Sequence, residues 1–146
     1  MTSGGDIAMA LRSAYLALHR RSDAAFAPLG ITADQFVLLA ALVRGDAMTQ
    51  RELARRMSSD PSTVRAMIVL LERRGLVARE AHPTDSRART VAATAEGRRV
   101  FRKLWAAGDP VRDRITAPMK PGETDSLVNM LHRVAASLNP AAPEDE

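Results

Sequence analysis

The sequence predicts a mainly α-helical protein that carries one small β-hairpin. Apolar residues recur at steps of three and four over most of the chain, which is the period of an amphipathic helix. Two capping boxes, Thr32 with Gln35 and Thr49 with Glu52, mark helix starts. After Gly75 the pattern changes to two short extended runs joined by a turn, which is typical of a hairpin.

Three helices are expected before the centre of the chain. The first covers residues 7–26, where Ile7 begins a row of apolar side chains on one face. The second starts after Thr32 and ends at Gly45, for which we expect a left-handed C-cap. The third starts after Thr49 and is short, because the polar run SSDP follows it.

A fourth helix is expected over residues 61–74, with Asp60 as its N-cap and Pro61 in its first turn. Two helices joined by a short polar turn, the second of them basic, predict a helix-turn-helix motif. Two faces of this helix differ in chemistry. The core face is predicted to hold Val64, Met67, Ile68 and Leu71, and the opposite face Ser62, Arg65, Ala66, Val69 and Arg73.

The outward face of the fourth helix holds small and basic side chains of the kind that reach base edges in a DNA major groove. We therefore predict that Ser62, Arg65 and Arg73 contact DNA. The helix N-terminus and the hydroxyls of Ser62 and Thr63 also suit phosphate binding. A solvated helix face with two arginines is the alternative.

The hairpin has its strands in LVARE and RTVAA, and its loop lies in HPTDSRART, residues 82–90. The loop holds Arg87 and Arg89, and an arginine on a protruding loop suits the negative potential of a minor groove. Asp85 is expected to accept hydrogen bonds from the Arg87 guanidinium and hold it outward. The hairpin is thus predicted to be a DNA-binding wing.

The C-terminal part is expected to hold a long helix capped by Thr94, with a kink at GDP, residues 108–110. A last helix is expected from about Pro121. The tail at 139–146 is rich in proline and acidic residues, which is typical of disorder.

Composition points to one cytoplasmic globular domain. The 146 residues are 46% hydrophobic and contain no cysteine, which excludes disulfides and thiolate sites. We expect no signal peptide and no membrane-spanning segment. Residues 44–102 hold 13 arginines and 7 acidic residues, a net of +6, whereas the rest of the chain carries −2. This distribution favours nucleic acid, although a solubility device or a membrane-surface patch would share it.

Catalysis and metal binding find little support in the sequence. The chain has no G-x-S-x-G, P-loop, dinucleotide-binding glycine pattern or H-E-x-x-H, so we expect no enzyme and no cofactor. Its three histidines, His19, His82 and His132, lie far apart without the paired spacing of a zinc site. We expect no metal.

The runs MTQRELARRMSSDPSTVRAMIVLLERRGLV and GLVAREAHPTDSRARTVAATAEG resemble the MarR family, the multiple antibiotic resistance regulators. The resemblance implies a bacterial, homodimeric winged helix-turn-helix repressor and a single domain over residues 1–146. Its parts would be dimerisation helices in 1–30 and 95–138, a DNA-binding lobe in 31–94 and the tail.

The resemblance also implies how such a dimer would use DNA and ligands. The helix over 61–74 would enter the major groove, and Arg87, braced by Asp85, would enter the minor groove of a near-palindromic operator. A small aromatic or lipophilic effector would release the DNA. Arg12, Tyr15 and His19 on the first helix would bind that effector; the alternative is that Tyr15 packs in the dimer interface and His19 is a surface residue.

Three residues of the fourth helix depart from the family pattern, in which polar or charged side chains are frequent. They are Ala66, Val69 and Leu70. Apolar residues on an exposed face would also serve a protein partner, so a protein-interaction module that has lost DNA binding is the rival function. The wing residues Asp85 and Arg87 favour DNA.

Overall fold

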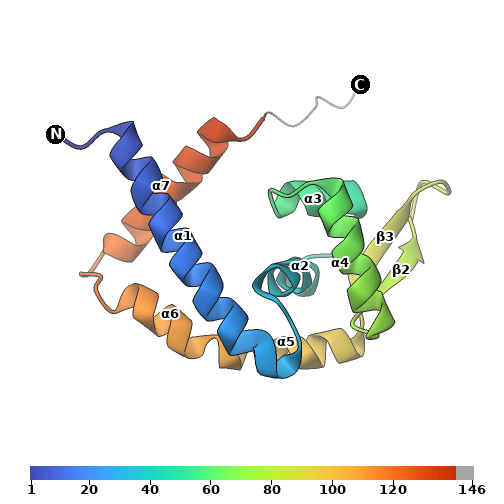
Figure 1. Ribbon diagram of the computed structural model, residues 1–146. Coiled ribbons are helices and arrows are strands. Elements are labelled where there is room, and N and C mark those ends of the chain that lie inside the picture. The colour runs from blue at the N-terminus through green and yellow to red at the C-terminus, as the bar shows by residue number, and fades with distance from the viewer. Residues whose placement is uncertain (141–146) are drawn as a thin grey trace. The chain divides into compact units, whose positions relative to one another are not determined.

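The computed structural model describes residues 1–140 and consists of helices with one small sheet (Figure 1). The elements in chain order are α1 (Gly4–Phe26), the 3₁₀ turn η1 (Ala27–Leu29), α2 (Ala33–Arg44), β1 (Met48–Thr49), α3 (Gln50–Arg56), α4 (Pro61–Arg73), β2 (Val77–Ala81), β3 (Arg89–Ala93), α5 (Ala95–Ala107), α6 (Asp109–Thr116) and α7 (Glu123–Leu138). This architecture confirms the predicted fold class. Of the tail predicted at 139–146, residues 141–146 lie outside the described residues.

The helix starts follow the predicted capping signals. Thr32 accepts the N–H of Gln35 at 3.1 Å, and the Gln35 side chain accepts the N–H of Thr32 at 3.0 Å. Thr49 and Glu52 make the same reciprocal pair. A third capping box was not predicted: Ser3 and Asp6 start α1 three residues before Ile7. The caps are local in sequence, which is why the pattern of residues predicts them.

The prediction of a left-handed C-cap at Gly45 is wrong. Its backbone is extended, with φ −116° and ψ −174°, a conformation open to any residue. A side chain here would instead meet its surroundings. An added Cβ would lie 2.8 Å from Cε of Met48 and 3.0 Å from the carbonyl oxygen of Ala41. Close packing at the end of α2 therefore accounts for this glycine.

Three antiparallel strands form the sheet, in the order β1-β3-β2. The hairpin has the predicted strands, with Val77 opposite Ala93 and Ala81 opposite Arg89. Strand β1 was not predicted; Met48 pairs with Val91. Two residues are too few for a period of two to appear in a sequence.

The chain divides into two compact units, Met1–Val111 and the residues from Arg112 onward. The core of the first unit joins the end of α1, α2, α3, α4, the sheet and α5. Its fully buried side chains include Leu38, Leu39, Leu42, Leu53, Val64, Ile68, Leu71, Leu76, Val77 and Leu104. Three stacked rings add to this core. The ring centroid of Phe36 lies 4.5 Å from that of Phe26 and 5.6 Å from that of Phe101. Residues of α4 and of the hairpin strands thus belong to the same core, which fixes the two elements relative to each other.

The expected kink at residues 108–110 is a break between two helices. Helix α5 ends at Ala107, α6 begins at Asp109, and the Gly108 N–H turns back to the carbonyls of Leu104 and Trp105. Pro110 lies in the first turn of α6, where a helix does not need its missing donor.

In the second unit, α7 has no buried residue. Val128, Met130, Leu131 and Leu138 are its exposed large apolar side chains. Within residues 1–140, no single helix is long and apolar enough to cross a membrane; Gly4–Leu29 and α2 reach that length and composition only as a bent pair.

Candidate nucleic-acid interface

Helices α3 and α4 form the predicted helix-turn-helix, with residues 57–60 as the turn. Asp60 caps α4, and Gln50 in the first turn of α3 donates through its side-chain nitrogen to the Pro61 carbonyl at 3.2 Å. This hydrogen bond joins the beginnings of the two helices. The angle at which α4 leaves the turn is therefore fixed by polar contacts as well as by the core.

Helix α4 presents the two faces that the sequence predicts. Val64, Met67, Ile68 and Leu71 are buried. On the opposite face Ser62, Arg65, Ala66 and Arg73 are exposed and Val69 is half-buried. Within the described residues, neither Arg65 nor Arg73 has an ion-pair partner. Both guanidinium groups are available to an external anion.

Thr63 is not a free phosphate donor. Its hydroxyl donates to Oδ2 of Asp60 at 2.6 Å, and its backbone N–H donates to Oδ1 of the same carboxylate at 2.9 Å. These two hydrogen bonds, the hydroxyl's being the stronger cause, lower the pKa of Asp60 below its usual value. A carboxylate already occupies the positive end of α4, so of the two predicted phosphate-binding hydroxyls the exposed Ser62 is the one that stays accessible.

The wing is stiffened in a different way from the one predicted. Asp85 accepts the backbone N–H of Arg87 at 2.9 Å, and within the described residues it makes no ion pair with that guanidinium. A short aspartate side chain reaches the N–H two residues on at little entropic cost, whereas a long arginine must be ordered to reach back. Asp85 therefore shapes the loop backbone and leaves the Arg87 side chain exposed.

His82 is a wing residue whose role the sequence analysis missed. Its Nδ1 accepts the backbone N–H of Asp85 at 3.0 Å and that of Thr84 at 3.2 Å. Two donors on one ring nitrogen require the tautomer with its hydrogen on Nε2. The loop also closes through its backbone, because the His82 N–H donates to Ala88. The sequence feature that could have indicated this role is the position of the histidine, directly before the Pro-Thr-Asp turn.

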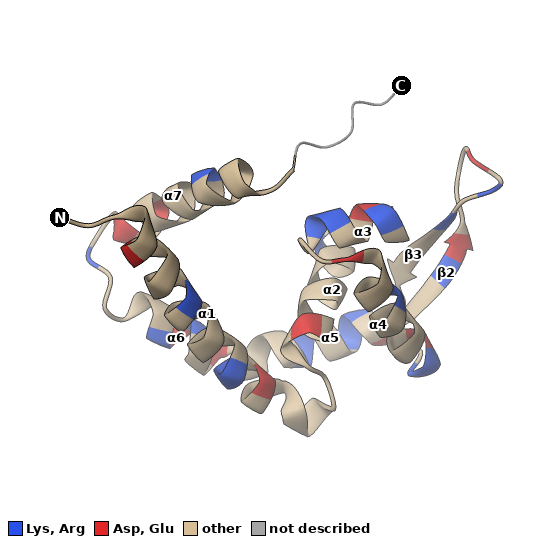
Figure 2. Cartoon of the chain, turned by 45° about the horizontal axis from the view of Figure 1, so that its top comes forward, with Lys and Arg blue, Asp and Glu red and all other residues tan. Residues whose placement is uncertain are grey.

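The arginines of the hairpin fall into two groups. Arg79 on β2 contacts Glu72 of α4, with Nε 3.6 Å from Oε2, and ties the hairpin to α4. Arg87 and Arg89 are exposed and, in the described part of the chain, have no ion-pair partner. Figure 2 shows basic segments on α3, on α4 and in the hairpin loop. The helix-turn-helix and the hairpin loop thus both carry exposed arginines that have no ion-pair partner among residues 1–140.

Arg74, the C-cap of α4, is a second residue that the sequence analysis missed. Its Nη1 donates to the Gly30 carbonyl at 2.7 Å and its Nη2 to the Leu29 carbonyl at 3.0 Å. The partners lie more than 40 positions earlier, in the turn that joins α1 to α2. No pattern among neighbouring residues predicts such a contact. Arg74 anchors the end of α4 to the turn between α1 and α2.

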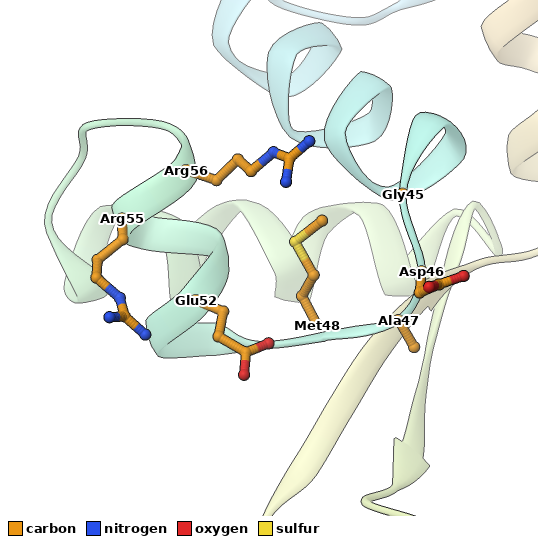
Figure 3. Close-up of a pocket in the computed structure, with 7 residues that line it drawn as sticks. All are labelled: Gly45, Asp46, Ala47, Met48, Glu52, Arg55 and Arg56. Carbon is orange, nitrogen blue, oxygen red and sulfur yellow. The ribbon is translucent and has the colours of Figure 1, made fainter. Parts of the chain in front are cut away.

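An open depression of about 650 Å³ lies between the end of α2, β1 and α3 (Figure 3). Its lining consists of Gly45, Asp46, Ala47, Met48, Glu52, Arg55 and Arg56. Two acidic and two basic side chains balance its charge. The depression contains none of the residues predicted to bind an effector.

The three predicted effector residues lie on one stretch of α1. The rings of Tyr15 and His19 are 5.7 Å apart, and Tyr15 and Arg12 are exposed. His19 joins two helices, with Nδ1 3.3 Å from Asp23 and Nε2 3.6 Å from Asp34 of α2. The His19 ring therefore contacts acidic side chains of both α1 and α2. In residues 1–140, no group of three His, Cys, Asp or Glu side chains is placed to hold a metal.

Comparison with known proteins gives a consistent result. The pattern of the MarR family matches residues 29–88. A helix-turn-helix-type transcriptional repressor from Mycobacterium tuberculosis is 35% identical over 102 residues, 67% of this chain and 73% of that protein. The structure of CouR from Rhodococcus jostii, bound to p-coumaroyl-CoA, is similar with a TM-score of 0.82 at 25% identity, covering 93% of this chain and 96% of that one. PcaV from Streptomyces coelicolor, in complex with its natural ligand, has a TM-score of 0.75 at 28% identity and covers 94% and 95%.

Proposed function

Since this chain belongs to the MarR family of winged helix-turn-helix transcriptional regulators, we propose that it is a homodimeric repressor in the bacterial cytoplasm that a small ligand releases from its operator. The family consists of DNA-binding regulators rather than enzymes. The similarity of this chain to a transcriptional repressor supports the proposal that it represses transcription.

One observation carries the proposal for DNA. Arg65, Arg73, Arg87 and Arg89 lie exposed on α4 and the hairpin, and none of them is ion-paired within the described residues. Unpaired arginines are suited to forked contacts with phosphates and guanine edges. A face that served only solubility would not need both a helix-turn-helix and a stiffened wing.

We place α4 in the major groove, where Ser62, Arg65 and Arg73 contact DNA, and the wing in the adjacent minor groove. Arg87 enters that groove, Asp85 and His82 hold its loop, and Arg89 contacts the backbone. Thr63 acts indirectly, through the Asp60 cap.

Dimerisation is supported by uncovered apolar side chains on two helices. In α1 they include Ile7, Met9 and Leu18, and in α7 they are Val128, Met130, Leu131 and Leu138. Burial against a second copy would remove this surface from water. Two-fold symmetry then implies a near-palindromic operator with half-sites about one helical turn apart. The dimerisation helices are those in 1–30 and 95–138, around the lobe at 31–94.

The dimer proposal has a direct test. Leu131→Asp places a charge on α7, so it should yield monomers and abolish tight operator binding. Sedimentation measures the change in mass. A Leu131→Asp protein that remains dimeric would place the interface elsewhere.

The effector proposal rests on relatives that bind ligands. CouR is bound to p-coumaroyl-CoA and PcaV to its natural ligand. We propose that Arg12, Tyr15 and His19 take part in binding a small aromatic or lipophilic effector. His19 bridges α1 and the start of α2, so a ligand there would act on the joint between the two helices. Ligands are then screened by release of the DNA.

The deciding experiment is binding to the DNA upstream of the protein's own gene, compared with a scrambled duplex over a salt series. We expect selective binding with a log–log salt slope of about −0.9 for each phosphate contacted. Equal, weak binding to both duplexes and to genome-wide fragments would favour the protein-interaction alternative. That alternative draws on Leu70, which is 48% exposed on α4.

A further inference from the structure

The outward stripe of α4 is apolar at its centre. Ser62, Ala66, Val69 and Arg73 follow one another at steps of four, three and four residues, which places them on one side of a helix. The polar members, Ser62 and Arg73, stand at the two ends. The face that would meet base edges thus offers an alanine and a valine at its middle.

Neither apolar residue belongs to the protein core. Ala66 is exposed, and Val69 is half-buried but is neither a member of the core nor packed against it. A β-branched residue lowers helix propensity, so helix propensity does not account for the valine, whereas alanine favours a helix. Val69 is therefore the residue of the pair that is best explained by what the helix contacts outside the protein.

Apolar side chains select for one chemical group in the major groove. A·T and G·C pairs present hydrogen-bond donors and acceptors there, and the C5-methyl of thymine is the apolar feature. Alanine and valine placed against polar base edges would leave those edges unpaired and dehydrated, which is unfavourable. Against a thymine methyl, the same side chains gain contact area.

We propose that Ala66 and Val69 read the C5-methyl groups of thymines at the centre of each operator half-site. The inference rests on the proposed DNA-binding function and adds the chemistry of the bases read. The two residues are separated by about 4.5 Å along the helix axis. The base-pair rise is about 3.4 Å. The thymines are therefore expected in neighbouring base pairs, with Ser62 and Arg73 on either side.

The test removes the methyl group and nothing else. Operators are first selected from a random duplex library with the full chain. Each thymine of the half-site is then replaced by deoxyuridine, which keeps Watson–Crick pairing but lacks the methyl. We expect a loss of about fourfold in affinity for each methyl read, the transfer free energy of one buried methylene. Deoxyuridine outside the half-sites is the matched DNA control.

The protein side of the test uses Val69→Ala. Because Val69 is outside the core, the variant should fold normally, as circular dichroism would show. On it, one thymine-to-deoxyuridine replacement should lose most of its effect. Leu70→Ala is the matched control: Leu70 is apolar and exposed at the edge of the stripe, about 100° around the helix from Val69. Sensitivity to deoxyuridine should therefore persist in this variant.

The outcomes separate this inference from the function on which it rests. Selective binding that no deoxyuridine weakens would overturn thymine readout and leave DNA-binding regulation intact. Failure to select any preferred duplex would overturn both. A fourfold loss that Val69→Ala abolishes and Leu70→Ala preserves would establish the inference.

Discussion

The carboxylate of Asp85 accepts the backbone N–H of Arg87 at 2.9 Å, so the acid shapes the wing loop and does not pair with the arginine head. The two residues therefore have separable roles: Asp85 holds the loop backbone, and Arg87 keeps an exposed guanidinium, the group that we propose contacts DNA.

Arg87→Ala should weaken operator binding by about 1–3 kcal/mol, because the groove contact is lost. Asp85→Ala should cost less, and Asp85→Asn should restore binding because an amide oxygen still accepts the N–H. Fluorescence anisotropy measures the affinities. Arg21→Ala removes the same charge from α1 and is the control. If Arg87→Ala binds the operator like the parent, the wing assignment is wrong.

His82→Ala should loosen the wing tip, because the N–H groups of Thr84 and Asp85 lose their acceptor. Their amide hydrogen exchange, followed by NMR, should accelerate about fivefold, as for one hydrogen bond of ordinary strength. In His82→Asn the amide oxygen replaces Nδ1, so exchange should stay slower than in His82→Ala. His132→Ala on α7 should leave these amides unchanged; equal exchange in all variants would contradict the role of His82.

Arg73 and Arg74 are neighbours with opposite expected phenotypes. Arg74→Ala removes two charge-assisted hydrogen bonds to Leu29 and Gly30 and should lower the free energy of unfolding by about 1–2 kcal/mol. Arg73→Ala should leave stability nearly unchanged and weaken DNA binding. Urea denaturation and anisotropy on both variants give the comparison. Equal stability of the two variants would contradict the anchor at Arg74.

Asp60→Ala should lower the stability of the protein in a pH-dependent way. Hydrogen bonds from Thr63 lower the pKa of Asp60 in the folded state, so the ionised cap stabilises the fold above the unfolded pKa of about 4. This contribution is lost as pH falls through the lower, folded-state pKa. The gap in melting temperature between parent and variant should be full at pH 7 and should narrow as the pH falls below the unfolded pKa of about 4. Asp46→Ala serves as the exposed control, and a gap that does not change with pH would exclude the cap.

Gly97→Ala should destabilise the protein by about 3 kcal/mol or more. An added Cβ would lie 2.0 Å from the Leu76 carbonyl oxygen, so α5 must move away from the start of the hairpin. Gly4 has nothing within 4 Å of its Cβ position, so Gly4→Ala is the matched control. Thermal unfolding of both variants tests the difference; equal melting temperatures would contradict this packing.

Local signals in the sequence sufficed for the helices and the hairpin. Capping boxes act over three residues, amphipathic faces repeat every turn, and hairpin strands alternate, so each is visible in a short window. For the same reason both faces of α4 were predicted correctly. The resemblance of the helix-turn-helix and hairpin runs was enough to indicate the family.

The tertiary structure decided two things. One is which residues remote in sequence come into contact, and the other is which of several possible hydrogen-bond partners a side chain takes. Strand β1 forms because Met48 pairs with Val91 at the edge of β3. Arg74 donates hydrogen bonds to carbonyls more than 40 positions earlier in the chain. Gly45 is needed for packing against Met48. Whether Asp85 would take the N–H or the guanidinium of Arg87 depended on the path of the loop. The sequence by itself determined the helices, the hairpin, the faces of α4 and the family, because those follow from near neighbours. The folded chain alone decided strand β1 and which remote atoms meet, because that depends on where distant segments come to lie.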